Sequence, residues 1–83
     1  MTETLIGVQK VLDENGKIYQ FSYYRMDSGK DYGICIRDQE GSMAMAPGVT
    51  TQRRRINALL RRLMRGGVSP TALGDVLEDW LAE

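Results

Sequence analysis

The chain has 83 residues, 42% of them hydrophobic and 27% charged, and its 11 basic and 11 acidic side chains give zero net charge. This length allows one domain with a small core, and the composition is that of a folded globular protein rather than a disordered tail. Zero net charge argues against a protein held to nucleic acid by overall electrostatics. No apolar run approaches the roughly 20 residues that a membrane-spanning helix needs.

The first residues and the cysteine content bear on the cellular location. Residues 1–9 lack the basic region and the sustained apolar segment of a secretory signal. The single cysteine, Cys35, cannot form an internal disulfide, which agrees with a reducing compartment. We therefore expect a cytoplasmic protein with no membrane partner.

The first half of the chain has the pattern of antiparallel strands, in which short runs of β-branched and aromatic residues alternate with turn signals. The first run, residues 5–12, leads to Asn15-Gly16, a pair that strongly favours a hairpin. The second run covers residues 17–26, and its side chains alternate between two faces. We expect the aromatic face of this strand to line the core. It carries Tyr19, Phe21 and Tyr23.

Two further strands follow. A turn at residues 27–30 precedes a third strand at residues 32–37, and a turn at residues 38–41 leads to a short fourth run at residues 42–46. We expect Pro47-Gly48 to end this fourth strand, because proline has no N–H for a strand ladder.

The last third of the chain contains two amphipathic helical patterns. Apolar side chains recur at helical spacing in each pattern, which predicts one apolar stripe per helix. Thr50 or Thr51 can cap the first helix, and Gly66-Gly67 supplies the left-handed residue that commonly ends one. Ser69 and Pro70 are typical N-cap and first-turn residues for the second helix. The stripes are Ile56, Leu59, Leu60, Leu63 and Met64, and Leu73, Val76, Leu77, Trp80 and Leu81.

The two helices carry opposite charge. Residues 53–65 contain six arginines and no acid, whereas residues 68–83 contain four acids and no base. Arginines in a first turn and acids in a last turn both oppose the helix dipole. If the helices fold back antiparallel, the first-turn arginines lie beside the last-turn acids, so we expect each group to offset the other.

These elements together predict an α+β fold in a single domain, residues 1–83. Residues 1–48 form a three- or four-stranded antiparallel β-meander. Residues 50–83 form an antiparallel helical hairpin packed on one sheet face. We expect Trp80 to lie in the core rather than in a binding site, because a small domain must cover its sheet with something large.

Catalytic chemistry finds little support in the residues. The chain has no histidine, no Cys-x-x-Cys pair and no phosphate-binding glycine loop. Cys35 is mid-strand with nothing to lower its pKa, so we expect a buried, unreactive thiol. The acids of the two later turns, Asp27, Asp31, Asp38 and Glu40, match no calcium loop and more commonly bond their own backbone. We predict no enzyme activity, no cofactor and no metal.

The arginine helix is the candidate interaction site. At about 100° per residue, five of its arginines form two neighbouring stripes that face away from the apolar side of the helix. The arginines either pair with the acidic helix or track phosphates. A helix-turn-helix DNA reader is disfavoured, because its second helix would here carry Asp75, Glu78 and Asp79 into the groove. The two stripes consist of Arg54, Arg61 and Arg65, and of Arg55 and Arg62.

Two segments, residues 32–36 (Tyr-Gly-Ile-Cys-Ile) and residues 68–79 (Val-Ser-Pro-Thr-Ala-Leu-Gly-Asp-Val-Leu-Glu-Asp), carry a family resemblance. They resemble a family of short, uncharacterised proteins, a domain of unknown function from anaerobic Gram-positive bacteria. The resemblance extends over most of the chain from Lys17 onward. It implies a small intracellular bacterial domain, and it implies no activity or ligand.

The favoured functional hypothesis is a small non-enzymatic interaction module. It binds a protein partner or a second copy through the helical hairpin or a sheet edge, where an exposed edge strand can accept another strand. The alternative is a nucleic-acid-binding protein that uses the arginine face on phosphates.

Overall fold

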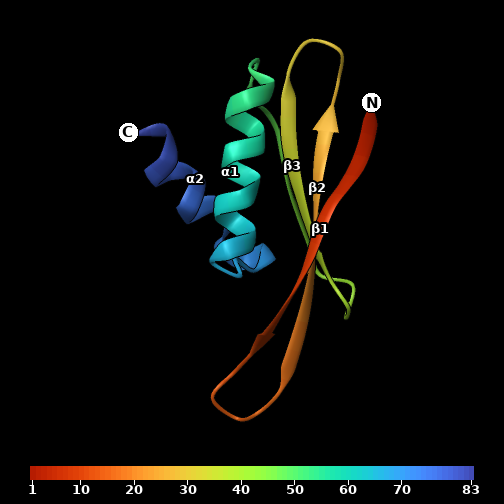
Figure 1. Ribbon diagram of the computed structural model, residues 1–83, viewed down its shortest axis with the longest axis vertical. Helices are drawn as coiled ribbons and strands as arrows, with labels where there is room; N and C mark the ends of the chain where they lie inside the picture. The colour runs from red at the N-terminus through yellow and green to blue at the C-terminus, as the bar shows by residue number, and fades with distance from the viewer.

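The computed structural model describes residues 1–83 and contains a four-stranded antiparallel sheet followed by two α-helices (Figure 1). The strands lie in the sheet in chain order, β1-β2-β3-β4, so the sheet is a meander. This confirms the predicted α+β fold class and shows that the meander has four strands rather than three. The elements are β1 (Thr2–Leu12), β2 (Ile18–Asp27), β3 (Tyr32–Asp38), β4 (Met43–Thr50), α1 (Arg53–Arg65), the 3₁₀ turn η1 (Pro70–Ala72) and α2 (Leu73–Leu81).

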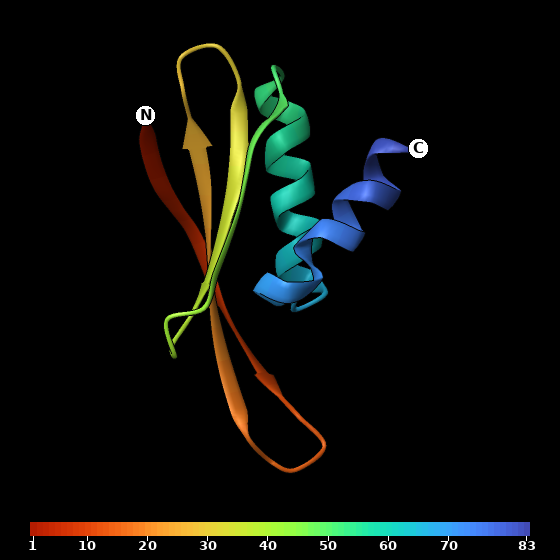
Figure 2. The same ribbon diagram turned by 180° about the vertical axis from the view of Figure 1, so that it is seen from behind.

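Both helices lie on the same side of the sheet. Helix α1 runs along the sheet, and α2 lies on the far side of α1, inclined away from it toward the C-terminus (Figures 1 and 2). Neither helix is long and apolar enough to cross a membrane. The molecule therefore has one covered sheet face and one face that no helix covers, which we call the open face.

The covered face forms the core. Phe21 and Tyr23 of β2 and two isoleucines of β3 pack against the apolar stripe of α1, and α2 adds Leu73 and Trp80. Tyr19 packs at the margin of this cluster, so the expectation that the aromatic face of the second strand lines the core is confirmed, as is the core position of Trp80. The α1 and β3 residues are Ile56, Leu59, Leu60, Leu63, Ile34 and Ile36, all at most 1% exposed.

The first helix ends as expected but begins differently. Gly67 has φ +59°, Val68 N–H donates to the Leu63 carbonyl and Gly67 N–H donates to the Met64 carbonyl. These are the two hydrogen bonds of a Schellman motif. At the other end the N-cap is Gln52, without a side-chain cap, so the expected Thr50 or Thr51 cap is wrong. Thr50 is instead the last residue of β4.

The second helix begins at the expected place with a tighter first turn. Ser69 and Pro70 open the 3₁₀ turn η1, and the α-helix itself starts at Leu73. The Ser69 hydroxyl lies 3.1 Å from the Thr71 hydroxyl and makes no cap hydrogen bond. The expected position is therefore confirmed, whereas the capping role of Ser69 is wrong.

The fourth strand continues where the sequence predicts its end. β4 runs through Pro47-Gly48 to Thr50, and its pairing with β3 shifts register between Tyr32 and Ile34. Proline is tolerated there because β4 is an edge strand and this part of its backbone lies at the register shift. Gly33 makes the shift possible, since a Cβ at this position would lie 2.5 Å from the Ala46 carbonyl oxygen.

Candidate functional site

Two of the five candidate arginines of α1 are engaged by α2 and the residues that follow it. Arg62 donates two hydrogen bonds to the Glu83 carboxylate, at 2.8 and 3.3 Å. This contact raises the pKa of Arg62 and lowers the pKa of Glu83. The Arg55 guanidinium lies over the Trp80 ring, 4.6 Å from its centroid. Both side chains therefore help to attach α2 to α1.

The expected pairing of the two charged helices is largely wrong. Glu83 forms its ion pair with Arg62, and the first-turn Arg55 adds only a weaker charge attraction that lowers the Glu83 pKa. The three other acids, Asp75, Glu78 and Asp79, make no ion pair. The reason is geometric, because α2 inclines away from α1 and separates the two charged surfaces (Figure 2). Charge complementarity therefore contributes a single ion pair to the hairpin.

The other three candidate arginines are unpaired. Arg54, Arg61 and Arg65 are exposed and make no ion pair, and Arg53 at the start of the helix is likewise unpaired. The stripe from Arg54 to Arg65 spans eleven helical steps, or roughly 16 Å at 1.5 Å per residue. It is a basic surface with no acidic neighbour on its own helix.

The open face of the sheet gathers most of the exposed large hydrophobic side chains. The chain has eight such residues; Leu81 lies elsewhere, on α2, and Met1 precedes β1 and lines a small hollow with Met26 and Gly33. The strand register places the other six on the side opposite the core residues, since paired residues share a face. These six are Leu5, Val8, Leu12, Ile18, Met43 and Met45, between 45% and 68% exposed.

The centre of the open face is closed by its own side chains. Arg37 Nη2 donates to both carboxylate oxygens of Glu3, at 2.9 and 3.0 Å, and its guanidinium lies 4.5 Å from the Tyr24 ring centroid. Cys35, paired with Tyr24 in the register, is completely buried although no helix covers it. Burial raises the pKa of the Cys35 thiol, which Arg37 partly opposes. The expectation that Cys35 is buried is confirmed.

The two edges of the sheet differ in how they can meet another chain. The β4 edge contains Pro47 and a register shift, features that blunt an edge strand. The β1 edge is eleven residues long and contains no proline, and its register shift between Leu5 and Gly7 leaves regularly paired segments on both sides. The β1 edge is therefore the better strand template.

A cleft of about 420 Å³ opens on the helix side, between the β1–β2 arm and η1. Its floor is apolar, formed by Val11, Tyr19, Phe21 and Pro70, and its rim carries Asp38 and three hydroxyl side chains. Tyr19 and Phe21 stack with ring centroids 6.2 Å apart. The cleft gives these core aromatics a solvent-facing side.

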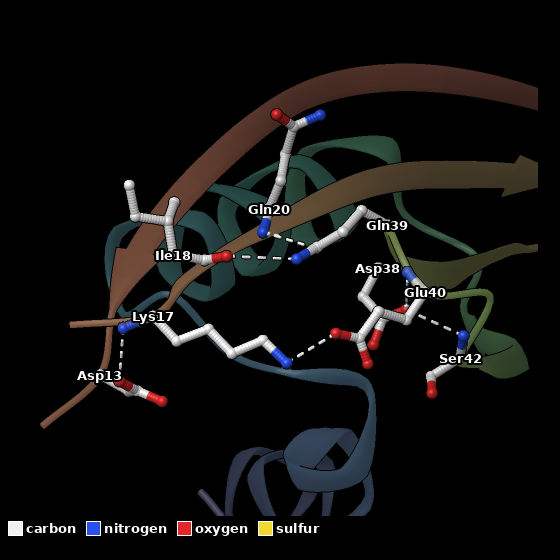
Figure 3. A network of polar contacts seen from close by, with 8 residues as sticks. All are labelled: Asp13, Lys17, Ile18, Gln20, Asp38, Gln39, Glu40 and Ser42. Carbon is white, nitrogen blue, oxygen red and sulfur yellow. Dashed lines mark hydrogen bonds and ion pairs between the residues drawn. The ribbon is translucent and has the colours of Figure 1, made fainter. Parts of the chain in front are cut away.

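A network of polar contacts fixes the loop beside this cleft (Figure 3). Gln39 accepts a hydrogen bond from Gln20 N–H at 2.7 Å and donates to the Ile18 carbonyl, so its amide continues the pairing of β2 beyond the end of β3. Lys17 and Glu40 form an ion pair at 2.7 Å. Each of these polar groups has a hydrogen-bond or ion-pair partner within the network, so we interpret the network as structural.

Two of the four turn acids, Asp27 and Asp38, bond their own backbone as expected, whereas Asp31 accepts from the Ser28 hydroxyl and Glu40 pairs with Lys17. One Asp38 oxygen accepts hydrogen bonds from the backbone N–H groups of Glu40 and Ser42, at 2.9 and 2.8 Å. Asp27 accepts from Gly29 N–H in the same way. No group of three or more Asp, Glu or Cys side chains is arranged to hold a metal ion.

Comparison with known proteins places the chain in a family. Residues 2–83 match a family of unknown function. The chain belongs to this family, DUF6514. No curated protein and no solved structure matches it. The DUF6514 match covers nearly the whole chain, including β1, which lies outside the resemblance seen in the sequence.

The open face of this DUF6514 chain is the surface that sequence reasoning missed. Both faces of the edge strands are apolar, as in the run Met43-Ala44-Met45-Ala46, so alternation alone does not say which face the helices cover. A signal was present in β2. Once Tyr19, Phe21 and Tyr23 are assigned to the core, the strand pairing determines which side chains of the neighbouring strands face the core. Combined with hairpin pairing, this assignment places Leu12 and Ile18 together on the other side.

Proposed function

We propose that this DUF6514 chain is a small, non-enzymatic interaction module that binds another protein through its open sheet, meaning the open face and the β1 edge. The single observation that carries the proposal is the concentration of six exposed large hydrophobic side chains on the face without helices. Exposed apolar side chains that gather on one face, unlike singly scattered ones, commonly mark a binding surface.

The size of the open face supports the proposal. Four strands at about 4.8 Å spacing and roughly eight residues of 3.3 Å rise give a projected area of about 500 Å². Side-chain relief increases the accessible area beyond this, toward the roughly 800 Å² per partner of a standard protein interface. The open face is therefore large enough for a specific contact without help from the helices.

The setting of this role is part of the proposal. We place it in the cytoplasm of an anaerobic Gram-positive bacterium, supported by the lone cysteine and the residues at 32–36 and 68–79. The absence of histidine leaves no side chain with an ordinary pKa near neutrality for proton transfer, which supports a binding role over catalysis.

Site-specific photo-crosslinking in the cell that naturally makes the protein tests this proposal. A photoreactive amino acid replaces Met45 on the open face, and the matched control carries it at Ala58, which is exposed on α1. We expect a discrete crosslinked protein band at position 45 that is lost when Val8→Glu is added. Crosslinking at position 45 no stronger than at position 58 would overturn the proposal.

Nucleic-acid binding is the second candidate, supported by the unpaired arginines of α1. Arg54, Arg61 and Arg65 have no carboxylate partner, so all three are available to phosphates. Fluorescence anisotropy with single- and double-stranded oligonucleotides tests this at low and near-physiological salt. Binding that weakens steeply with salt and disappears in the Arg54→Glu, Arg61→Glu, Arg65→Glu variant would establish it, and no binding at low salt would exclude it.

A further inference from the structure

The outer edge of β1 presents backbone hydrogen-bonding groups at positions that the two hairpins fix. Asp13 N–H donates to the Lys17 carbonyl at 2.9 Å, so this pair is hydrogen-bonded and bonding alternates back along β1. The register pairs Val8, Lys10 and Leu12 with β2 residues at the non-bonded positions. Their N–H and C=O groups therefore point outward, away from β2.

The same argument from the other hairpin fixes the first half of β1. Ser28 N–H donates to the Asp31 carbonyl at 3.2 Å, so alternation turns the backbone groups of Tyr24 and Met26 toward β3. Their partners across β1, Leu5 and Glu3, are then at non-bonded positions and also point outward. Because of the register shift between Leu5 and Gly7, the residues whose backbone groups point outward have their side chains on the open face in both halves of β1.

We propose that β1 pairs antiparallel with β1 of a second copy, in the register that places Glu3 opposite Lys10 and Leu5 opposite Val8. Each of these pairs occurs twice by symmetry, and all use outward-pointing backbone groups. The result is one continuous sheet through two molecules, with a self-complementary interface related by a twofold axis. This inference rests on the proposed interaction role and names a second copy as the partner at the β1 edge.

Side-chain chemistry selects this register. Glu3, which also binds Arg37 of its own chain, and Lys10 have opposite charges, and such cross-strand pairs stabilise a sheet. Sliding the second strand by two residues matches outward-pointing groups only in the outer pairs, because Val8 then lies opposite Gly7, which bonds to β2. It also places Glu3 opposite Leu12 and Leu5 opposite Lys10. Both of those pairs join a charge to an apolar side chain, so the proposed register is the one in which charge and hydrophobicity agree.

Disulfide trapping tests the register directly. Residues of a hydrogen-bonded antiparallel pair have Cα atoms about 5.5 Å apart, which a disulfide spans. We expect a Leu5→Cys variant mixed with a Val8→Cys variant to form a covalent dimer under mild oxidation, whereas each variant alone stays uncrosslinked. Leu5 is three residues from its own symmetry mate along the pair, roughly 10 Å, so self-crosslinking is excluded. No disulfide in the mixture, or equal disulfide in either variant alone, would overturn the proposal.

Charge variants test the same interface without covalent chemistry, by sedimentation at micromolar concentrations. Lys10 is exposed and makes no ion pair, so Lys10→Glu leaves the fold intact and places two glutamates opposite each other. We expect the dimer dissociation constant to rise about tenfold. Glu3→Lys also breaks the exposed ion pair with Arg37, which contributes little to stability. Mixing it with Lys10→Glu should restore association, because each chain then supplies one sign of charge. Lys30→Glu, the same change in the exposed β2–β3 turn, should have no effect.

The outcomes separate this inference from the proposed function. A protein that is monomeric at every concentration would overturn the β1 pairing while leaving a Met45 photo-crosslink to another protein intact. A dimer that is insensitive to Lys10→Glu but lost in Met45→Glu would also overturn it, and would place the second copy on the open face.

Discussion

The two faces of the sheet are built from the same strands but have different environments. On the covered face, Ile34 and Ile36 are completely buried beneath α1. On the open face, Met43 and Met45, which alternate with alanines that pack against the core, are about half exposed. The difference shows that apolar side chains on both sides of a strand do not predict two cores, since the chain has helices for only one side.

The centre and the periphery of the open face differ in how exposed their side chains are. At its centre, Cys35 and Met26 are buried by neighbouring side chains of the same face, beside the Glu3–Arg37 ion pair. At its periphery, Leu12 and Ile18 are well exposed. The centre of the open face therefore needs no cover from another element, whereas its exposed periphery can be covered by another protein. The four predictions below test this contrast.

Truncating a side chain on the covered face should have the largest effect. Ile36→Ala removes a completely buried side chain from the core, and such changes cost about 2–5 kcal/mol of unfolding free energy. The matched control is Met45→Ala on the open face, where exposed truncations stay within about 0.5 kcal/mol. Urea denaturation of the two variants measures both values. Equal destabilisation would show that the open face is buried in solution.

Gly33, on the open-face side of β3, should tolerate no side chain. A Cβ there meets the Ala46 carbonyl oxygen at 2.5 Å and the Pro47 Cα at 2.8 Å, and both are backbone atoms that cannot rotate away. We expect Gly33→Ala to cost about 1–3 kcal/mol through backbone displacement. Gly74→Ala in α2, where nothing lies within 4 Å, should instead stabilise by roughly 0.5–1 kcal/mol. Thermal unfolding with opposite shifts in Tm would confirm both.

Tyr23 joins the covered face to the helical linker through its hydroxyl. It donates a 2.8 Å hydrogen bond to the Val68 carbonyl, and Tyr23→Phe should cost about 1 kcal/mol because that carbonyl loses its partner. Burial raises the pKa of Tyr23 to about 12 from 10.0. The folded state therefore retains this proton longer than the unfolded state. The associated stability is complete below pH 10 and is lost as the pH rises toward 12.

Denaturation of wild type and Tyr23→Phe at several pH values separates these two effects. The stability difference should be constant at neutral pH and shrink above pH 10, because only the wild type has the Tyr23 titration. The other three tyrosines are present in both proteins and cancel. A difference that does not change with pH would contradict the burial of this hydroxyl.

Much of the fold could be predicted from local signals. Asn15-Gly16, the aromatic alternation around Phe21 and the Gly66-Gly67 stop each report local backbone geometry, and the structure agrees at all three. The continuation of β4 through Pro47 could not be predicted this way, because it depends on the edge position of β4 and on the small size of Gly33. Such features follow from tertiary contacts rather than from local sequence.

The candidate site was less predictable for a related reason. Charge patterns identify Arg62 and Arg55 as polar surface, but the inclination of α2 decides that one pairs with Glu83 and the other covers Trp80. The open face required knowing which side of the sheet the helices choose. Helix stripes and strand alternation each show that a face is apolar, and only their packing shows which face remains uncovered.

Removing the Arg37 side chain at the centre of the open face should change stability little but should change the labelling rate of Cys35. Arg37→Ala removes the guanidinium that lies over Tyr24 and binds Glu3, so Cys35 becomes more accessible. We expect labelling of Cys35 by a thiol reagent to become several-fold faster, roughly, while the thermal midpoint hardly moves because exposed ion pairs contribute little. Arg37 also lowers the Cys35 pKa, so its loss alone would slow the reaction. Faster labelling must then reflect access. Arg54→Ala on α1 is the control, and an unchanged rate in Arg37→Ala would mean that the strands of the sheet, rather than the Glu3–Arg37 pair, close this centre.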